Sequence, residues 1–218
     1  MKRVFVPVIV SVMLSLLSCS KERISGNGSI VTESRNVNNF TGVSASGSTK
    51  VYINRGATFK VEVKGYSNLL PYYETRLVNN TLQLGYQQNV NIKNDNTEVF
   101  ITLPVLHAIS LFGSGDISTS GSFDGNTDFT ASIAGSGNIH FSNGTTENFT
   151  SSIAGSGNIY TLNMVAAKAE AIISGSGNTE ITASNELKVK ISGSGNVYYK
   201  GTPVINTIIS GSGAVIPK

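Results

Sequence analysis

The chain has 218 residues, enough for one large or two small domains, and 39% of them are hydrophobic, which is ordinary for a folded protein. Only 13% are charged, tryptophan is absent and there are 23 glycines, a mixture that suits strands and tight turns better than helices. Without Lys2 and Arg3, 14 of the 16 basic residues remain against 13 acidic ones, so the charge gives no sign of a nucleic-acid-binding surface.

Residues 1–19 have the features of an export signal. Lys2 and Arg3 are followed by an apolar stretch, residues 4–17, that is too short to cross a bilayer as a helix. The stretch runs into Leu-Leu-Ser-Cys, which resembles the bacterial lipobox, in which cleavage exposes a cysteine that carries the lipid. We predict a lipoprotein signal peptide, lipidation with palmitate at Cys19 and a flexible tether over residues 20–28. An ordinary signal peptide cut nearby, with Cys19 incidental, is the alternative.

Cys19 is the only cysteine, so the mature body has no disulfide and no thiolate ligand or nucleophile. Between residues 29 and 106 the sequence predicts several strands separated by turns. Pro71 disfavours the continuation of a helix from Leu70, so residues 68–80 are expected to contain a turn or a short helical piece. The predicted strands lie in "STKVYI", "FKVEV", "TLQLGY", "VNIK" and "VFITL".

The triplet Gly-Ser-Gly recurs through residues 107–218, at intervals of 22, 20, 20, 18 and 18 residues, and "SASGSTKVYI" around Gly47 is a degenerate copy. The residue two before each triplet is always Ile or Leu, and apolar residues tend to alternate with polar ones further upstream. This period of two is typical of a strand with one buried face. The same count places His107 on the inward side of the first repeat.

A unit of this length cannot bury its apolar side alone, whereas stacked units can bury a continuous core. Equivalent residues of successive coils would lie about 4.8 Å apart. The sequence therefore predicts an all-β fold, a β-solenoid with coils of about 18–22 residues. No linker divides it, so we expect one domain over residues 29–218, with irregular coils over 29–106 and Gly-Ser-Gly coils over 107–218. Two domains are the alternative.

Glycine is expected at the corners of the coils, where the chain needs a positive φ or a close backbone approach. Asparagine follows four of the corners in register, and stacked asparagine side chains can hydrogen-bond from one coil to the next. The predicted corner glycines are Gly113, Gly115, Gly135, Gly137, Gly155, Gly157, Gly175, Gly177, Gly193, Gly195, Gly211 and Gly213. The predicted ladder consists of Asn138, Asn158, Asn178 and Asn196, with Asp116 in the same place in the first copy.

Three features together resemble the head GIN domain family of auto-transporter adhesins. They are "GNGSIVTESRNVNNFTGVSASGSTKVYI", "VKGYSNLLPYYETRLVNNTLQL" and the serial "SGSGN", which cover residues 26–216. The resemblance implies a right-handed parallel β-helix, often found on exported lipoproteins of Gram-negative bacteria, and it brings no catalytic residues. "CSKER" is also similar to signals that send lipoproteins to the outer face of the outer membrane. Surface and periplasmic exposure both stay open.

The position five residues after the first glycine of each corner points outward and is often aromatic. Stacked rings with polar edges can bind sugars or a protein partner, so His140, Tyr160 and Tyr198 form the candidate binding surface. The alternative is that tyrosine only stabilises an exposed strand face. The whole column is Ser118, His140, Tyr160, Glu180 and Tyr198. In another outward column, Glu170 and Lys188 are expected to form a surface ion pair.

Other kinds of site find little support. Gly-Ser-Gly-Asn lacks the third glycine and the following helix of a dinucleotide-binding loop. Glycine-rich calcium-binding repeats carry an Asp in each copy, whereas Asp116 stands alone here. Asp116, Asp124 and Asp128 form only a loose acidic group, and a catalytic triad has no obvious members. We predict no metal, no cofactor and no catalytic residues.

We therefore expect a lipid-anchored cell-envelope protein of the binding or adhesin type, held in the outer membrane. Its ligand would be a glycan or a protein surface. A carbohydrate-active protein that binds or cleaves polysaccharide, and a purely structural envelope module, are the alternatives. The sequence after Gly211, "SGAVIPK", offers no helical cap for the last coil, so we also expect homo-oligomerisation through an end or a flank of the solenoid.

Overall fold

The computed structural model describes residues 22–218, and the predicted signal peptide and Cys19 lie outside the described residues. Within the described range the chain is built from strands, and no helix is long and apolar enough to cross a membrane. The N-terminal part contains β1 (Glu22–Ser25), β2 (Ile30–Ser34), β3 (Gly42–Gly47), β4 (Lys50–Arg55), β5 (Lys60–Tyr66), the 3-10 turn η1 (Leu70–Tyr72), β6 (Tyr73–Val78), β7 (Thr81–Tyr86), β8 (Val90–Lys93) and β9 (Glu98–Leu103). The repeat region contains β10 (Ala108–Gly113), β11 (Asp116–Ser120), β12 (Ser122–Gly135), β13 (Asn138–His140), β14 (Asn143–Gly155), β15 (Asn158–Gly175), β16 (Asn178–Gly193), β17 (Val197–Lys200), β18 (Val204–Gly211) and β19 (Val215–Pro217).

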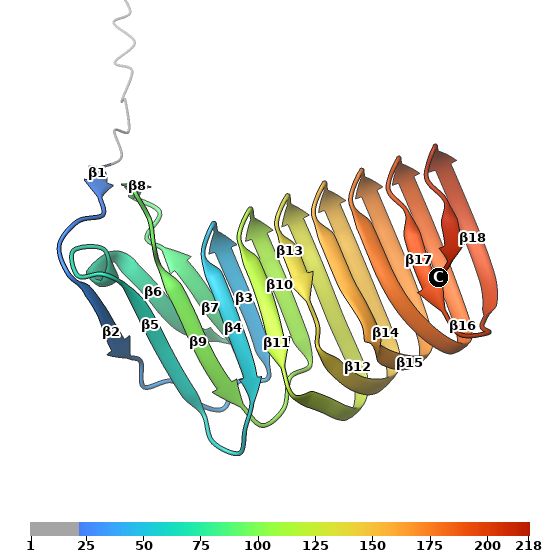
Figure 1. The fold of residues 1–218 in the computed structure, drawn as a ribbon, viewed down its shortest axis with the longest axis horizontal. Coiled ribbons are helices and arrows are strands. Elements are labelled where there is room, and N and C mark those ends of the chain that lie inside the picture. The colour runs from blue at the N-terminus through green and yellow to red at the C-terminus, as the bar shows by residue number, and fades with distance from the viewer. Residues whose placement is uncertain (1–21) are drawn as a thin grey trace, which may run out of the picture.

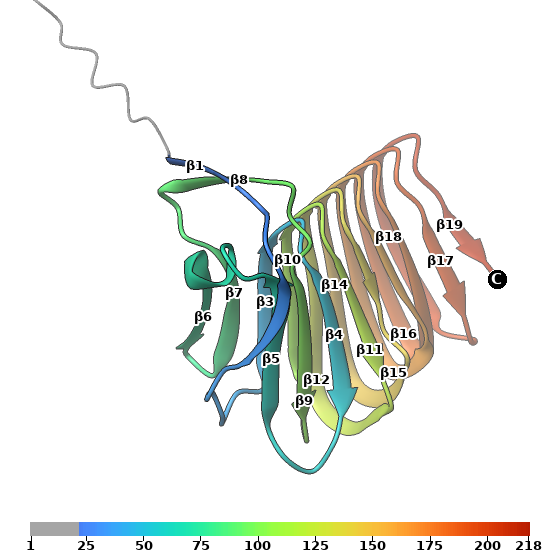
Figure 2. The same cartoon turned by 60° about the vertical axis from the view of Figure 1, so that its left-hand side comes forward.

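The strands form a β-solenoid of stacked parallel coils, as the repeats predict (Figure 1). One face carries the strand order β2-β5-β9-β4-β11-β13-β15-β16-β17-β19. The other carries β6-β7-β3-β10-β12-β14-β15-β16-β18. The long strands β15 and β16 belong to both faces, because each runs around the coil. The corners of successive coils line up along one ridge (Figure 2).

The core lies between the faces and is continuous from coil to coil. Ile133, Ile153, Ile173 and Ile191 occupy directly paired positions on β12, β14, β15 and β16. Each is at most 2% exposed. A fully buried aliphatic side chain stabilises the fold by about 1.5–3 kcal/mol. The isoleucine that each coil adds to this column contributes about that much. The column of buried isoleucines therefore confirms the predicted alternation of apolar and polar residues.

The N-terminal end is closed by antiparallel strands, which the sequence did not indicate in full. β5 pairs antiparallel with β2 and β9, and β6 pairs antiparallel with β7. Asn79 and Asn80 join β6 to β7 with φ values of 47° and 59°. A two-residue turn with both φ values positive matches the twist of a hairpin. The predicted helical piece is limited to η1, and β6 follows it directly.

The predicted tether over residues 20–28 is not free along its length. Residues 22–25 form β1, which pairs in parallel register with β8. The backbone N–H of Gly26 donates to Lys93, and the side chain of Asn94 donates to the Gly26 carbonyl. Backbone pairing with the distant strand β8 therefore attaches this segment to the solenoid. The local amino-acid composition does not indicate such a long-range contact.

The Gly-Ser-Gly corners hold the coils in register. The first glycine of each triplet has a φ of 125–141°, which residues with a Cβ rarely adopt. The Gly135 carbonyl accepts hydrogen bonds from the backbone N–H groups of Ser156 (2.9 Å) and Gly157 (3.1 Å), and the same pair of bonds recurs in the other coils. A Cβ on Gly155 would lie 2.2 Å from the Gly135 oxygen, so only glycine allows this approach.

Asparagine side chains form a ladder next to the corners. The Asn158 amide donates to Asn138 Oδ1 at 3.0 Å, and Asn158 Oδ1 accepts from both the side chain (3.0 Å) and the backbone N–H (3.1 Å) of Asn178. Asn196 repeats this pattern on Asn178. At the first coil Asp116 accepts from Asn138 at 2.9 Å. A carboxylate suits this position, because the ladder requires only an acceptor there.

We expect Gly155→Ala to destabilise the protein by more than about 3 kcal/mol, because the new methyl group would clash with a backbone carbonyl and the positive φ would be strained. Gly47→Ala is the matched control, since Gly47 also has a positive φ (91°) but no atom lies within 4 Å of the Cβ position. It should cost only about 1–2 kcal/mol. Urea unfolding followed by circular dichroism measures both. Equal losses would contradict the role assigned to corner contact.

Asn158→Ala should lower the free energy of unfolding by about 1–2 kcal/mol, because it leaves the N–H groups of Asn178 and the Asn138 oxygen without their partner. Asn148→Ala is the control, since this exposed side chain bonds only to Asp128 (3.1 Å) and the Thr127 carbonyl (3.4 Å). Its loss should change stability by less than about 0.5 kcal/mol. A denaturation midpoint for Asn158→Ala equal to that of Asn148→Ala would show that the ladder does not stabilise the stack.

Candidate functional site

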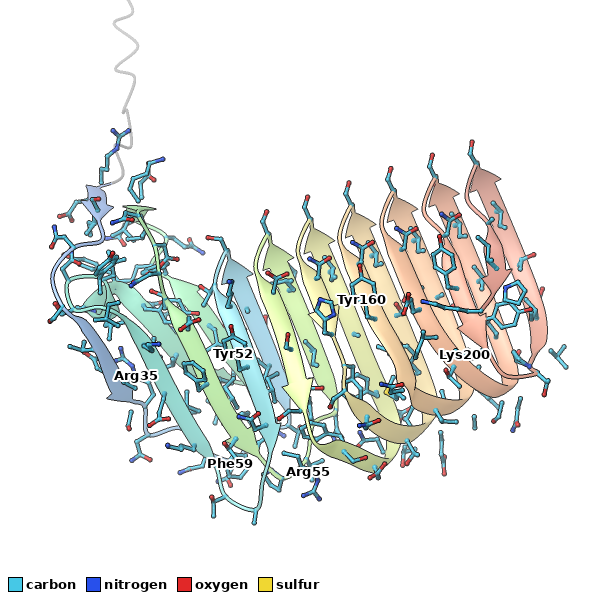
Figure 3. All side chains as sticks on the ribbon, in the orientation of Figure 1. Arg35, Tyr52, Arg55, Phe59, Tyr160 and Lys200 are labelled. Carbon is cyan, nitrogen blue, oxygen red and sulfur yellow. The ribbon has the colours of Figure 1, made fainter. Side chains whose placement is uncertain are left out.

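A row of outward side chains runs along the face that contains β4, β11 and β13. Backbone pairing places one residue from each successive strand in register at this position. We call it the aromatic row. In spatial order it consists of Phe100, Tyr52, Ser118, His140, Tyr160, Glu180 and Tyr198. The three residues of the predicted binding surface therefore lie in one line, and Figure 3 shows Tyr52 and Tyr160 along the same face.

Two pairs of rings in the row are stacked. The His140 and Tyr160 rings have centroids 4.6 Å apart and planes 14° apart, and the Tyr52 and Phe100 rings have centroids 5.1 Å apart and planes 15° apart. These separations are close to the spacing of neighbouring strands, about 4.8 Å. The rings therefore stack because paired backbones hold them at that distance, and the stacking adds to sheet stability.

Two short interruptions separate the rings. Ser118 lies between Tyr52 and His140, and its strand pairs with both of theirs. Glu180 lies between Tyr160 and Tyr198. The two interruptions differ in charge, because Ser118 is neutral. Glu180 accepts a hydrogen bond from Lys218, whose Nζ lies 5.9 Å from the centroid of the Tyr198 ring.

The backbone below the row is rigid because the side chains on the opposite side of the same strands are packed in the core. Ile117, Ile139 and Ile159 directly precede Ser118, His140 and Tyr160 and are 0% exposed. A row that is built on such strands keeps its spacing without a ligand. Little backbone conformational entropy would therefore be lost if a ligand bound to it.

Tyr52 and Phe100 belong to the row but were not predicted from the sequence, for two different reasons. Tyr52 lies five residues after Gly47, so the count used for the later repeats reaches it once the degenerate corner is included. Phe100 lies on β9, outside the repeats, and is in register with Tyr52 because β9 pairs directly with β4 in parallel. No pattern in the sequence signals that contact.

Two expectations about other side chains are wrong. His107 is exposed and lies before β10, whereas Leu106 is fully buried, so the alternation of the repeats does not extend back to this position. Lys188 pairs with Glu186 of its own strand at 3.3 Å, not with Glu170. Glu170 and Lys188 are in register on neighbouring strands, but the lysine side chain turns along its own strand instead.

In the part of the chain that the structure describes, Asp116, Asp124 and Asp128 do not gather into one group. Asp116 accepts from Asn138 in the ladder, and Asp128 accepts from Asn148 at 3.1 Å. Asp124 lies in an exposed part of β12. Among residues 22–218, no three or more His, Cys, Asp or Glu side chains are grouped so that they could hold a metal ion. The predicted lipidation site, Cys19, lies outside the described residues.

Two tyrosines at the N-terminal end have perturbed ionisation. Burial raises the pKa of Tyr73 and of Tyr86 well above the usual range for phenols. The Tyr86 hydroxyl donates to Asp95 at 2.7 Å and also bonds to Thr97, and the two rings meet edge to face with centroids 5.0 Å apart. The packing of these two rings helps to hold β6 against β7.

Known proteins match the chain in family and in fold. A family described as "Putative auto-transporter adhesin, head GIN domain" matches residues 39–203. A search of curated proteins finds no match. A putative adhesin from Bacteroides fragilis has a similar structure, with a TM-score of 0.75 and 22% identity over 89% of this chain and 100% of that one.

Two further solved structures share the fold. A putative lipid binding protein from Parabacteroides distasonis matches with a TM-score of 0.64 and 22% identity over 90% of this chain and 100% of that chain. A putative adhesin from Parabacteroides merdae matches with a TM-score of 0.62 and 19% identity over 90% of this chain and 99% of that chain. At these identities the structures establish the fold alone. The family match covers most of the sequence, and the chain belongs to the head GIN domain family of auto-transporter adhesins.

Proposed function

We propose that this protein is held at the cell envelope by a lipid on Cys19 and binds a glycan through the aromatic row. The observation that carries the proposal is the presence of two stacked ring pairs in one outward row. His140 stacks on Tyr160 and Tyr52 stacks on Phe100, each pair at the spacing of the strands. The adhesin description of the family agrees with an extracellular or surface role.

The chemistry of the row favours a sugar over an apolar ligand. Aromatic rings offer flat apolar faces, and the row adds hydrogen-bonding groups from the hydroxyls of Tyr52, Tyr160 and Tyr198, the imidazole of His140 and the Ser118 hydroxyl. Sugars have both apolar C–H faces and many hydroxyls, so they match this combination. A protein surface is the other ligand class that the sequence leaves open, and it is an outcome of the test below.

The proposed anchor would hold one defined end of the solenoid at the membrane. Glu22, where β1 begins, is only the third residue after Cys19, and β1 lies at the end of the solenoid opposite β18 (Figure 1). The aromatic row follows the long axis, so a lipid at that end would leave most of the row accessible. Insertion in the outer membrane is part of the proposal, with either surface or periplasmic exposure.

Self-association is a further part of the proposal. β18 is exposed along its length, and it carries the apolar side chains of Val204 (76% exposed) and Ile208 (68% exposed). Exposed strands with apolar side chains tend to pair with other chains. A single monomer mass by light scattering over a wide concentration range would count against it.

The double variant Tyr160→Ala/Tyr198→Ala should lose specific signals on a glycan array, because each substitution removes a ring face and a hydroxyl from the row. Phe112→Ala is the matched control, since Phe112 is 51% exposed on the other face and its loss should leave binding unchanged. Equal signals from the double variant and the parent protein would contradict the role of the row. Binding to a protein but to no glycan would replace the sugar as the ligand class.

Cys19→Ser should abolish metabolic labelling of the protein with a palmitate analogue in a Gram-negative host and release it from the membrane fraction, because no other cysteine can carry the acyl chain. The control is the double variant Lys21→Ala/Arg23→Ala, which keeps Cys19 and should still be labelled. Labelling of the Cys19→Ser protein, or membrane association without any label, would contradict the proposed anchor.

A further inference from the structure

The aromatic row is interrupted at Ser118. On each side of this position lies a ring that is stacked against a second ring behind it. Tyr52 has Phe100 stacked on one face, and His140 has Tyr160 stacked on one face. The remaining face of each ring is directed along the row toward Ser118, whose strand lies between the two. Two ring faces therefore stand opposite each other, and each is supported from behind.

The distance between these two faces follows from the strand spacing. β4 and β13 both pair with β11, so Tyr52 and His140 are two strand spacings apart, about 9.5 Å. Carbon atoms in van der Waals contact lie about 3.5–4.0 Å apart. One ring-shaped ligand therefore fits between the faces, and two do not. A flat aromatic ring is too thin to contact both the Tyr52 and the His140 ring. A puckered saturated ring with its substituents is thick enough to contact both.

Polar side chains border the gap on both sides along the strands. Two residues before the row, Asp116 is in register with Lys50 and Asn138. Two residues after the row, Ser120 is in register with Asn54, and their side chains are hydrogen-bonded. Carboxylate, ammonium, amide and hydroxyl groups thus lie at the rims, and the Ser118 hydroxyl lies at the floor.

We infer that one pyranose ring of the glycan ligand inserts between Tyr52 and His140, with its faces against the two rings and its hydroxyls at the polar rims. We call this place the Ser118 slot. The inference rests on the proposed function, because it assigns the sugar and its position within the same row. It adds two things to that function: the ligand is a saturated six-membered sugar ring, and one short side chain makes room for it.

The small size of Ser118 is the property that the slot requires. A phenylalanine at this position would complete a continuous stack from Phe100 to Tyr160 and fill the space for the sugar. If the row acted only as a broad aromatic surface, the added ring would maintain or strengthen binding. If the slot is the site, the same substitution blocks it.

The experiment uses the full chain carrying Cys19→Ser in a mild detergent and a panel of linear hexose and N-acetylhexosamine oligosaccharides as probes. We expect Ser118→Phe to weaken binding of the probe that the parent protein binds by about tenfold or more. Ala134→Phe is the matched control, because it adds a ring beside Phe112 on the other face of the solenoid, outside the row, and leaves the slot open. It should bind the probe within about threefold of the parent.

The chain also contains its own reporter. His140 and His107 are the only histidines, so imidazole signals in a proton–carbon NMR spectrum belong to two side chains, and His140→Gln assigns them. Ring stacking on an inserted sugar should shift the His140 signals and leave those of His107, which lies outside the row, unchanged. Because the readout needs no loss of fold, it remains valid if Ser118→Phe lowers stability.

The outcomes separate the slot from the proposed function. A probe that shifts His140 and is lost in Ser118→Phe supports the inference. A probe that binds through Tyr160 and Tyr198 but leaves His140 unchanged, or binds Ser118→Phe as tightly as the parent, overturns the slot and leaves the aromatic row as the binding surface. Absence of binding to every oligosaccharide overturns both.

Discussion

Each corner carbonyl that accepts two backbone N–H groups from the next coil holds neighbouring coils of the solenoid in register. The Gly135 carbonyl receives Ser156 and Gly157 in this way, and the geometry tolerates no Cβ at Gly155. This contact explains why residue types recur in register. Because the coils cannot slip past one another, isoleucines meet isoleucines inside, and amides meet amides at the corner.

The same constraint gives the aromatic row its shape. A free tyrosine side chain loses conformational freedom when it stacks, but here the backbone already brings neighbouring rings to about one strand spacing. The ring pairs are therefore present before any ligand arrives. The interruptions have an equally fixed width, so the identity of a single residue, Ser118 or Glu180, determines whether the row offers an open space or a charge held by Lys218.

Much of this arrangement could be predicted from the sequence, because a solenoid turns sequence intervals directly into spatial neighbours. The spacing of Gly-Ser-Gly was enough to predict the fold and the vertical column of Ile133, Ile153, Ile173 and Ile191. Apart from the Glu170–Lys188 pair, the failures lie where the repeat ends. His107 falls outside the alternation, β1 pairs with a strand more than sixty residues away, and Phe100 joins the row through non-repeating strands. Long-range pairing of that kind leaves no periodic trace.

The match between adjoining coils also affects how such a chain can change over generations. Residues 132–139 and 152–159 both read Ser-Ile-Ala-Gly-Ser-Gly-Asn-Ile, and they occupy the same place in consecutive coils. Unequal recombination between the two coding segments would remove or duplicate a block of 20 residues and keep the reading frame. Either product would rejoin identical corners, so the rod could be shortened or lengthened by about 4.8 Å without exposing its interior.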